Sequence, residues 1–224
     1  MPERPGLLRR SVAEGLAAFA LVFAGCGAVV TNATHQGALG AVGVSLVFGL
    51  VIMVMIYAVG HISGAHFNGA VTFAFALTRH FPWPRAAGYW LAQLTGAIVA
   101  ALLLRASLGD VADVGATLPA GSQAQSFFFE LVMTGFLMFV ILAVATDTRA
   151  VGEAAAIAIG GTIALDAMFG GPISGASMNP MRSIGPAIAS GNFHALWLYV
   201  VAPLLGAALG GLAYQVVREE SVPR

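Results

Sequence analysis

Apolar residues are concentrated in six long windows, which are separated by connections of different lengths. Acidic residues within them are limited to Glu14, Glu130 and Asp166. Each window approaches the length of about 20 residues that a helix needs to cross the hydrocarbon core of a bilayer. The pattern predicts an all-α integral membrane protein with six transmembrane helices. The windows are Ser11–Val30, Leu39–Val59, Ala86–Leu104, Phe127–Ala145, Ala154–Gly171 and Ala195–Val217.

Two of the connections, 60–85 and 172–194, are long for loops in a compact bundle. Each contains a short apolar stretch, Ala70–Leu77 in the first and Met181–Ala189 in the second. A helix of about 11 residues rises roughly 16 Å, which is about half of the ~30 Å core. We therefore expect two re-entrant half-helices that enter from opposite faces and meet near the midplane. Irregular backbone is tolerated there only where it is buried in protein or lines a cavity.

The two connections share a motif. Residues 62–69 read ISGAHFNG, and residues 173–180 read ISGASMNP, about half a chain length later. Glu14 and Glu130 repeat this relationship near the start of each half. Because each half holds three spans, the second half is inverted relative to the first. Inverted repeats place a transport site at the repeat interface near the midplane.

The composition agrees with a membrane location and excludes several other classes. Of the 224 residues, 58% are hydrophobic and 9% are charged, whereas soluble domains have about 25% charged residues. The net charge is zero and lysine is absent, so no basic surface for nucleic acid is expected. Cys26 is the single cysteine, which excludes a disulfide framework. No nucleophile–base pair, phosphate loop or metal cluster is recognisable, so we expect neither an enzyme nor a cofactor.

The arginines predict the orientation. With the N-terminus inside, only Arg105 and Arg182 fall on the far side. Positive residues favour the cytoplasmic side. We therefore expect a multi-pass protein of a bacterial-type inner membrane with both termini in the cytoplasm. The arginines on that side are Arg4, Arg9, Arg10, Arg79, Arg85, Arg149, Arg218 and Arg224.

Over nearly its whole length, the chain resembles the aquaporin, or major intrinsic protein, family. That family carries an Asn-Pro-Ala box in each of two re-entrant loops of a six-span inverted repeat. The resemblance implies one channel domain over 1–224, with repeats at about 9–106 and 125–217, and a homotetramer with one pore per subunit. The boxes of this chain are Asn68-Gly69-Ala70 and Asn179-Pro180-Met181.

Both boxes depart from the family pattern. Gly69 stands where the family has Pro, and Met181 stands where it has Ala. Proline suits the first position of a helix because its φ is preset. One hypothesis is that the loss of this ring loosens the middle of the pore. Another is that Met181 crowds the midplane, which would close the pore and leave a structural membrane protein.

Asn68 and Asn179 are well suited to cap the two half-helices. Capping can leave their NH₂ groups free to donate toward the lumen. Each helix N-terminus carries about half a positive charge. Two such termini at the midplane would repel cations and protons and let a neutral solute pass.

The resemblance also places an outer selectivity filter at Phe48, Ala167, Ala176 and Arg182. Water-selective members have His where Ala167 stands, and glycerol-conducting members typically supply two aromatic residues. Small residues at two positions imply a wide filter, similar to the nodulin-like branch that includes carriers of metalloid acids. We expect a passive channel for water and small uncharged solutes that excludes ions. The alternative is a mainly water-selective pore.

Further polar residues have alternative interpretations. Glu14 and Glu130 resemble the family's buried glutamates, which hydrogen-bond the loop backbones; the alternative is proton coupling in a secondary transporter. His66 either supports the first loop or is merely packed or lipid-facing. Asp166 is either a functional group beside the filter or an acceptor of hydrogen bonds from a neighbouring helix.

Overall fold

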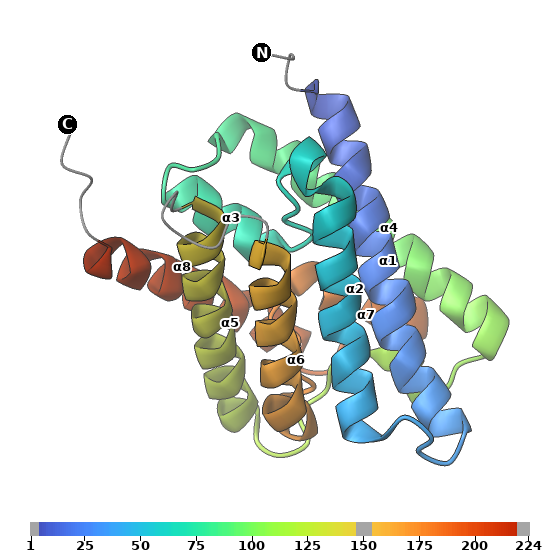
Figure 1. The fold of residues 1–224 in the computed structure, drawn as a ribbon. Helices are drawn as coiled ribbons and strands as arrows, with labels where there is room; N and C mark the ends of the chain where they lie inside the picture. The colour runs from blue at the N-terminus through green and yellow to red at the C-terminus, as the bar shows by residue number, and fades with distance from the viewer. Residues whose placement is uncertain (1–4, 147–153, 219–224) are drawn as a thin grey trace, which may run out of the picture.

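The structure, a computed structural model, describes residues 5–146 and 154–218. Within these residues it consists of eight α-helices and one short turn (Figure 1). They are α1 (Leu7–Thr34), α2 (Gly40–Ser63), α3 (Gly69–Leu77), α4 (Trp83–Leu108), the turn η1 (Ala112–Gly115), α5 (Gln123–Thr146), α6 (Ala155–Ser174), α7 (Pro180–Ser190) and α8 (Leu196–Val217).

The predicted fold class is confirmed. Helices α1, α2, α4, α5, α6 and α8 are long and apolar enough to cross a membrane. Most of them extend past the apolar windows, as α1 does from Leu7 to Thr34, because helical hydrogen bonding continues into the polar ends that a hydropathy pattern leaves out. The two half-helices are α3 and α7, with 9 and 11 residues.

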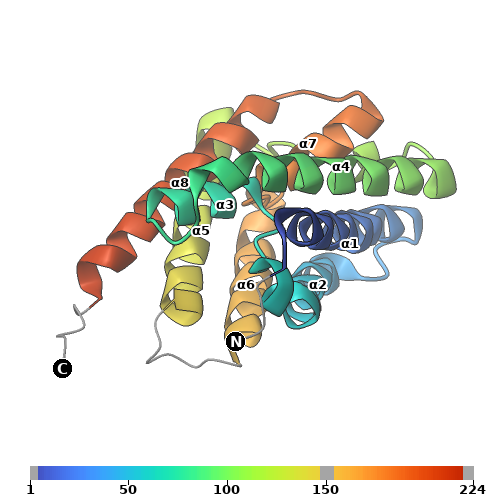
Figure 2. The same cartoon turned by 90° about the horizontal axis from the view of Figure 1, so that it is seen from above.

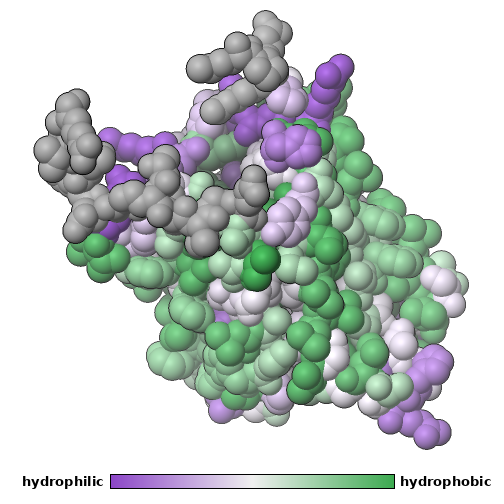
Figure 3. Space-filling model, in the orientation of Figure 1, coloured by the Kyte–Doolittle hydropathy of each residue, from purple (hydrophilic) through white to green (hydrophobic). Residues whose placement is uncertain are grey.

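The outer surface of the bundle is apolar along the helices. Large hydrophobic side chains face outward, among them Leu8, Leu91 and Val216. In Figure 3, hydrophobic residues cover the middle of the visible face, and hydrophilic residues gather toward its upper and lower ends. An exposed apolar surface of this extent is expected where a protein meets lipid.

Helix packing follows the inverted repeat. α1 lies between α2 and α4, as Figure 2 shows, and α5 contacts α6 and α8 in the same way. α2 of the first half packs against α6 of the second. The half-helices fill the space between these groups: α7 packs mainly on α4, and α3 packs mainly on α8. Their N-terminal ends therefore meet inside the bundle.

Small residues allow the close approach of α2 and α6. A Cβ atom on Gly160 would lie 2.6 Å from the carbonyl oxygen of Gly49, and a Cβ on Gly49 would meet the carbonyl oxygen of Gly160. The two backbones are thus in contact, which is the way that small residues bring membrane helices together.

The orientation remains a prediction. An even number of spans places both chain ends on one side of the membrane. Three of the arginines used to orient the chain, Arg4, Arg149 and Arg224, lie outside the described residues.

Two adjacent glycines of α6, Gly160 and Gly161, test the close contact between α2 and α6. Gly160→Ala should destabilise the protein by about 1–3 kcal/mol, because the methyl group meets backbone atoms of α2 that cannot move aside alone. Gly161 is the matched control, since a Cβ there meets nothing within 4 Å. Gly161→Ala should be neutral or stabilising by up to about 1 kcal/mol. Thermal unfolding in detergent measures both, and equal stability of the two variants would contradict the packing.

Candidate functional site

The loop before α3 is held by the buried carboxylate of Glu14. Its Oε1 atom accepts hydrogen bonds from the backbone N–H of His66 at 2.9 Å and the Ser63 hydroxyl at 2.6 Å. Its Oε2 atom accepts from the N–H of Phe67 at 2.7 Å and the Gln93 amide at 2.8 Å. A carboxylate inside a membrane protein is costly unless it is paired or hydrogen-bonded, and here four donors meet it.

Glu130 repeats this arrangement before α7. Its Oε1 atom accepts from the Ser174 hydroxyl and the N–H of Ser177, both at 2.8 Å. Its Oε2 atom accepts from the N–H of Met178 at 2.7 Å. The predicted contacts between the two glutamates and the loop backbones are therefore present.

Both loops have an unusual backbone that explains why such anchors are needed. Ala65 and Phe67 have φ values of 55° and 44°, and the equivalent Ala176 and Met178 have 43° and 53°. Non-glycine residues rarely adopt this left-handed region, at a cost of about 1–2 kcal/mol per residue. A backbone of this kind does not form regular hydrogen bonds within itself, so its N–H groups need side-chain acceptors. The N–H groups of Ala65 and Ala176 donate to the Ser63 and Ser174 hydroxyls, and the next two N–H groups of each loop donate to the carboxylates.

Two tyrosines that the sequence analysis did not single out connect the ends of α2 and α6 to the next spanning helices, α4 and α8. Tyr89 donates to the carbonyl of Ser63 at 2.5 Å, and Tyr199 donates to the carbonyl of Ser174 at 2.6 Å. Both rings are fully buried. These tyrosines recur at equivalent places in the two halves, and this recurrence in the sequence could have identified them.

Asn68 and Asn179 cap the half-helices and also bond to each other's loops. Each Oδ1 accepts from the N–H groups two and three residues later. The Asn68 amide donates to the carbonyl of Met178 at 2.7 Å, and the Asn179 amide donates to the carbonyl of Phe67 at 2.9 Å. An amide nitrogen has two N–H donors, so one remains on each asparagine.

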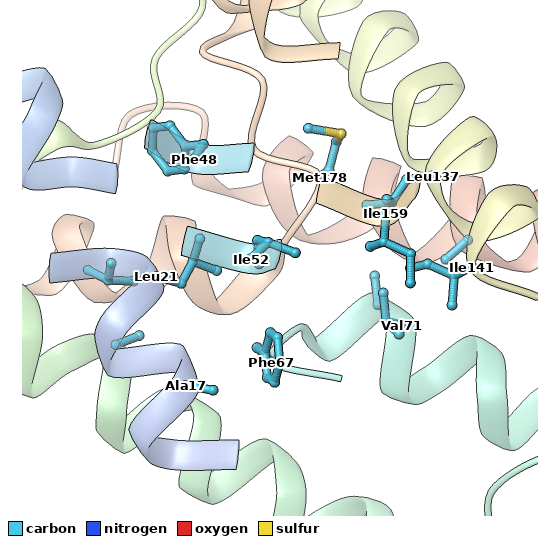
Figure 4. Packing of buried hydrophobic residues seen from close by; sticks show 14 of the residues in the cluster. Ala17, Leu21, Phe48, Ile52, Phe67, Val71, Leu137, Ile141, Ile159 and Met178 are labelled. Carbon is cyan, nitrogen blue, oxygen red and sulfur yellow. The ribbon is translucent and has the colours of Figure 1, made fainter. Parts of the chain in front are cut away.

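A cavity runs from these asparagines toward the helix ends at Gly60, Ala145 and Ala155. One wall is apolar and is formed by side chains from α1, α2, α3, α5 and α6, including Leu21, Ile52, Val71, Ile141 and Ile159 (Figure 4).

The opposite wall includes the first loop, residues 64–68. Among the described residues, no donor reaches the backbone carbonyls of 64–66 or of 175–177. The cavity is therefore lined by apolar side chains and by loop residues, and several carbonyl oxygens of these loops have no hydrogen-bond donor in the described part of the chain.

A second cavity adjoins the first at the other end and shares Phe48 and Arg182 with it. Its volume is about 290 Å³, compared with about 100 Å³ for the first. Phe48 and Arg182 line both cavities, Ala176 lines the inner one and Ala167 lines the outer one. Of the four predicted filter residues, Phe48 and Arg182 therefore lie where the two cavities adjoin, and Ala176 and Ala167 each line one of the two cavities.

Arg182 is held at this junction by contacts that the sequence did not predict. Its Nη1 atom donates to the carbonyl of Gly115 at 2.8 Å, and its guanidinium carbon lies 4.9 Å from the ring centre of Phe48. Residues 112–115 form a turn with positive φ throughout, which aims this carbonyl. The buried Nε atom has no partner within the described chain.

The packing around Gly69 and Met181 bears on both hypotheses about the departures in the boxes. Met181 is not among the residues that line either cavity. Its terminal methyl lies 2.8 Å from the place of a Cβ on Gly69. The Met181 side chain therefore fills the space next to Gly69.

His66 and Asp166 are both buried. The His66 ring bonds to the Thr72 hydroxyl at 3.1 Å and stacks on Phe75, so it is not lipid-facing. Asp166 is fully buried, and neither of its carboxylate oxygens has a donor among the described residues. Of the two interpretations of Asp166, the one in which it accepts hydrogen bonds from a neighbouring helix therefore finds no donor in the described part of the chain. Asp166 also lines neither cavity.

Comparisons with known proteins agree with this geometry. The sequence matches the family described as Major intrinsic protein over residues 2–214. Aquaporin NIP1-1 of Zea mays is 50% identical over 217 residues, which cover 96% of this chain and 77% of that protein. Nodulin-26 of Glycine max is 48% identical over 217 residues, covering 96% and 80%.

Structural comparison leads to the same group. The X-ray structure of the aquaglyceroporin from Plasmodium falciparum matches with a TM-score of 0.83 and 26% sequence identity, over 95% of this chain and 97% of that chain. Six spans, two half-helices and paired asparagine caps thus accompany a sequence match over nearly the whole chain, and the chain belongs to the major intrinsic protein family.

Proposed function

We propose that this chain is a passive channel for water and for small uncharged solutes of the glycerol or metalloid-acid type. The observation that carries the proposal is the composition of the junction between the two cavities. Phe48 and Arg182 line both cavities, and two alanines, Ala176 and Ala167, line the inner and the outer cavity respectively. An alanine side chain is a single methyl group, so these four residues leave room beside the guanidinium for a solute larger than water.

The relatives support a channel of this class. They are named as aquaporins from plants and as an aquaglyceroporin. The second of these names refers to a solute class larger than water, and that protein has the same fold.

Polar groups along the pathway suit a hydroxylated neutral solute. The unused carbonyls of residues 64–66 and 175–177 accept hydrogen bonds, and the remaining N–H of Asn68 and of Asn179 donates them. The apolar wall opposite faces the carbon skeleton of a polyol. A small ligand site that is mostly apolar with few placed polar groups is the usual arrangement.

Ions are excluded by positive potential in this mechanism. The N-terminal ends of α3 and α7, each equivalent to about half a positive charge, meet beside the pathway, and Arg182 adds a full charge. Cations and protons are repelled. Anions are excluded because the narrow apolar wall cannot replace their hydration shell.

Glu14 and Glu130 act as structural anchors in this proposal. Every oxygen of the two carboxylates accepts at least one hydrogen bond from the loops or their supports. Neither residue lines a cavity. These contacts favour a scaffold role and disfavour proton coupling in a transporter.

We place the protein in the cell's inner membrane with both termini in the cytoplasm, as a homotetramer with one pore per subunit. The arginine distribution supports this orientation. The exposed apolar faces of the outer helices support contact with lipid or with other subunits.

The filter is tested by Ala167→His in protein reconstituted into liposomes. Stopped-flow light scattering should record rapid entry of glycerol or boric acid in the unmodified protein. The histidine should reduce this entry at least about tenfold, because it adds a ring to the narrow junction and a barrier of 1.4 kcal/mol is a factor of ten. Water flux should persist.

The matched control is Ala41→His, which adds the same ring to the exposed rim of the outer cavity. It should leave solute entry unchanged. Rapid water flow without solute entry in the unmodified protein would instead identify a water-selective pore and overturn the wide-filter proposal.

The electrostatic barrier is tested by Arg182→Met. Removing this charge should raise cation or proton leak at least about tenfold, since a unit charge at close range changes a barrier by roughly 1–4 kcal/mol. Arg105→Met is the control, because Arg105 pairs with Asp110 on the surface at 2.9 Å, away from both cavities. An unchanged leak in Arg182→Met, measured with a pH-sensitive dye in liposomes, would contradict a role for this charge.

A further inference from the structure

Gly69 and Met181 occupy equivalent regions of the two half-helices. Gly69 is the first residue of α3, directly after the cap Asn68. Met181 is the second residue of α7, after the cap Asn179 and Pro180. Both are positions at which this chain departs from the family's boxes.

The two side-chain positions share one space. A Cβ atom on Gly69 would lie 2.8 Å from Cε of Met181, 3.5 Å from its Cγ and 3.8 Å from its Sδ. A real Cβ needs more than 3 Å from its neighbours. The methionine side chain therefore occupies the place that a side chain at position 69 would take.

The two departures also balance in size. Exchanging Pro for Gly removes three carbon atoms, and exchanging Ala for Met adds two carbon atoms and one sulfur. Volume-conserving exchanges are those that packed interiors tolerate best. The flexible thioether of methionine is well suited to fill an irregular gap left by a ring.

We propose that Gly69 and Met181 form one packing unit, in which the methionine thioether takes the place of a proline ring and sets the spacing between the two capping asparagines. The bonds from Asn68 to Met178 O and from Asn179 to Phe67 O cross between the half-helices at 2.7 and 2.9 Å. Their lengths depend on how closely the two N-terminal ends approach. Gly69 and Met181 lie at that approach and outside both cavities, so they act as positioning residues and do not contact the solute.

A further contact holds this unit from the side. The Trp90 indole donates to the carbonyl of Gly69 at 3.1 Å, which fixes the start of α3 against α4. The gap at position 69 therefore cannot close by movement of this backbone alone, and a side chain must fill it.

A mutant cycle tests the pair through stability. Met181→Ala leaves a void, and Gly69→Pro places a ring against the methionine. Each single variant should lower the melting temperature in detergent by at least about 3 °C. Gly69→Pro with Met181→Ala should recover at least half of the summed loss, because the ring then fills the void.

The control combines Gly69→Pro with Met168→Ala. Met168 is a partly buried methionine of α6, outside both cavities, and it should give no recovery. Additive losses in the double variant at positions 69 and 181 would overturn the proposal. So would a double variant that fails to fold while Met181→Ala folds. Gly69→Ala with Met181→Ala provides a milder second cycle, and the same recovery is expected.

The positioning role has a separate readout and rests on the proposed function. Proton leak into liposomes should rise at least about tenfold in each single variant and return to the original level in the double variant. Recovery of stability without any change in leak in the single variants would overturn the positioning role. Failure of solute entry in the unmodified protein would refute the proposed function alone, because the stability cycle measures no transport.

Discussion

The structure depends on the satisfaction of backbone donors inside the membrane by Glu14 and Glu130. A polar backbone group left unpaired in hydrocarbon costs several kcal/mol, and each re-entrant loop presents two consecutive N–H groups to one carboxylate. These contacts hold a backbone that alternates into the left-handed region. The half-helices begin where the loops end, so the loops determine where the asparagine caps and Arg182 lie.

The same arrangement gives the pathway its chemical character. The two carboxylates bond to the loops, and the polar residues that line the cavities include Asn68, Asn179 and Arg182. A pore of this kind offers hydrogen bonds to a neutral molecule and positive potential to an ion. In the proposed function, the width at Ala167 and Ala176 sets how large a neutral molecule is admitted.

The spans, the half-helices and the caps could be predicted because each depends on local sequence. Apolar length identifies a span, and an asparagine before a short apolar stretch identifies a capped half-helix. The repeat also led to the two glutamates, since their spacing follows that of the boxes.

Contacts between distant segments could not be predicted in this way. The Gly115 carbonyl that holds Arg182 comes from a turn with no recognisable motif. Gln93, Tyr89 and Tyr199 are polar residues within apolar helices, and their partners become known only when the helices are packed.

The contact between Gly69 and Met181 was not predicted for the same reason. In the sequence alone, each departure from the family's boxes suggested a separate defect, and only the packed structure shows that the two positions share one space.

The most direct test of a passive, open pore is the dependence of solute influx on solute concentration and on ion gradients. Glycerol entry into liposomes should increase in proportion to its gradient, without saturation, and should not change when proton or sodium gradients are imposed. That result is expected if both glutamates serve the scaffold and the pathway is open. Saturating influx, or influx driven by an ion gradient, would show that the chain works as a coupled transporter and would contradict the account.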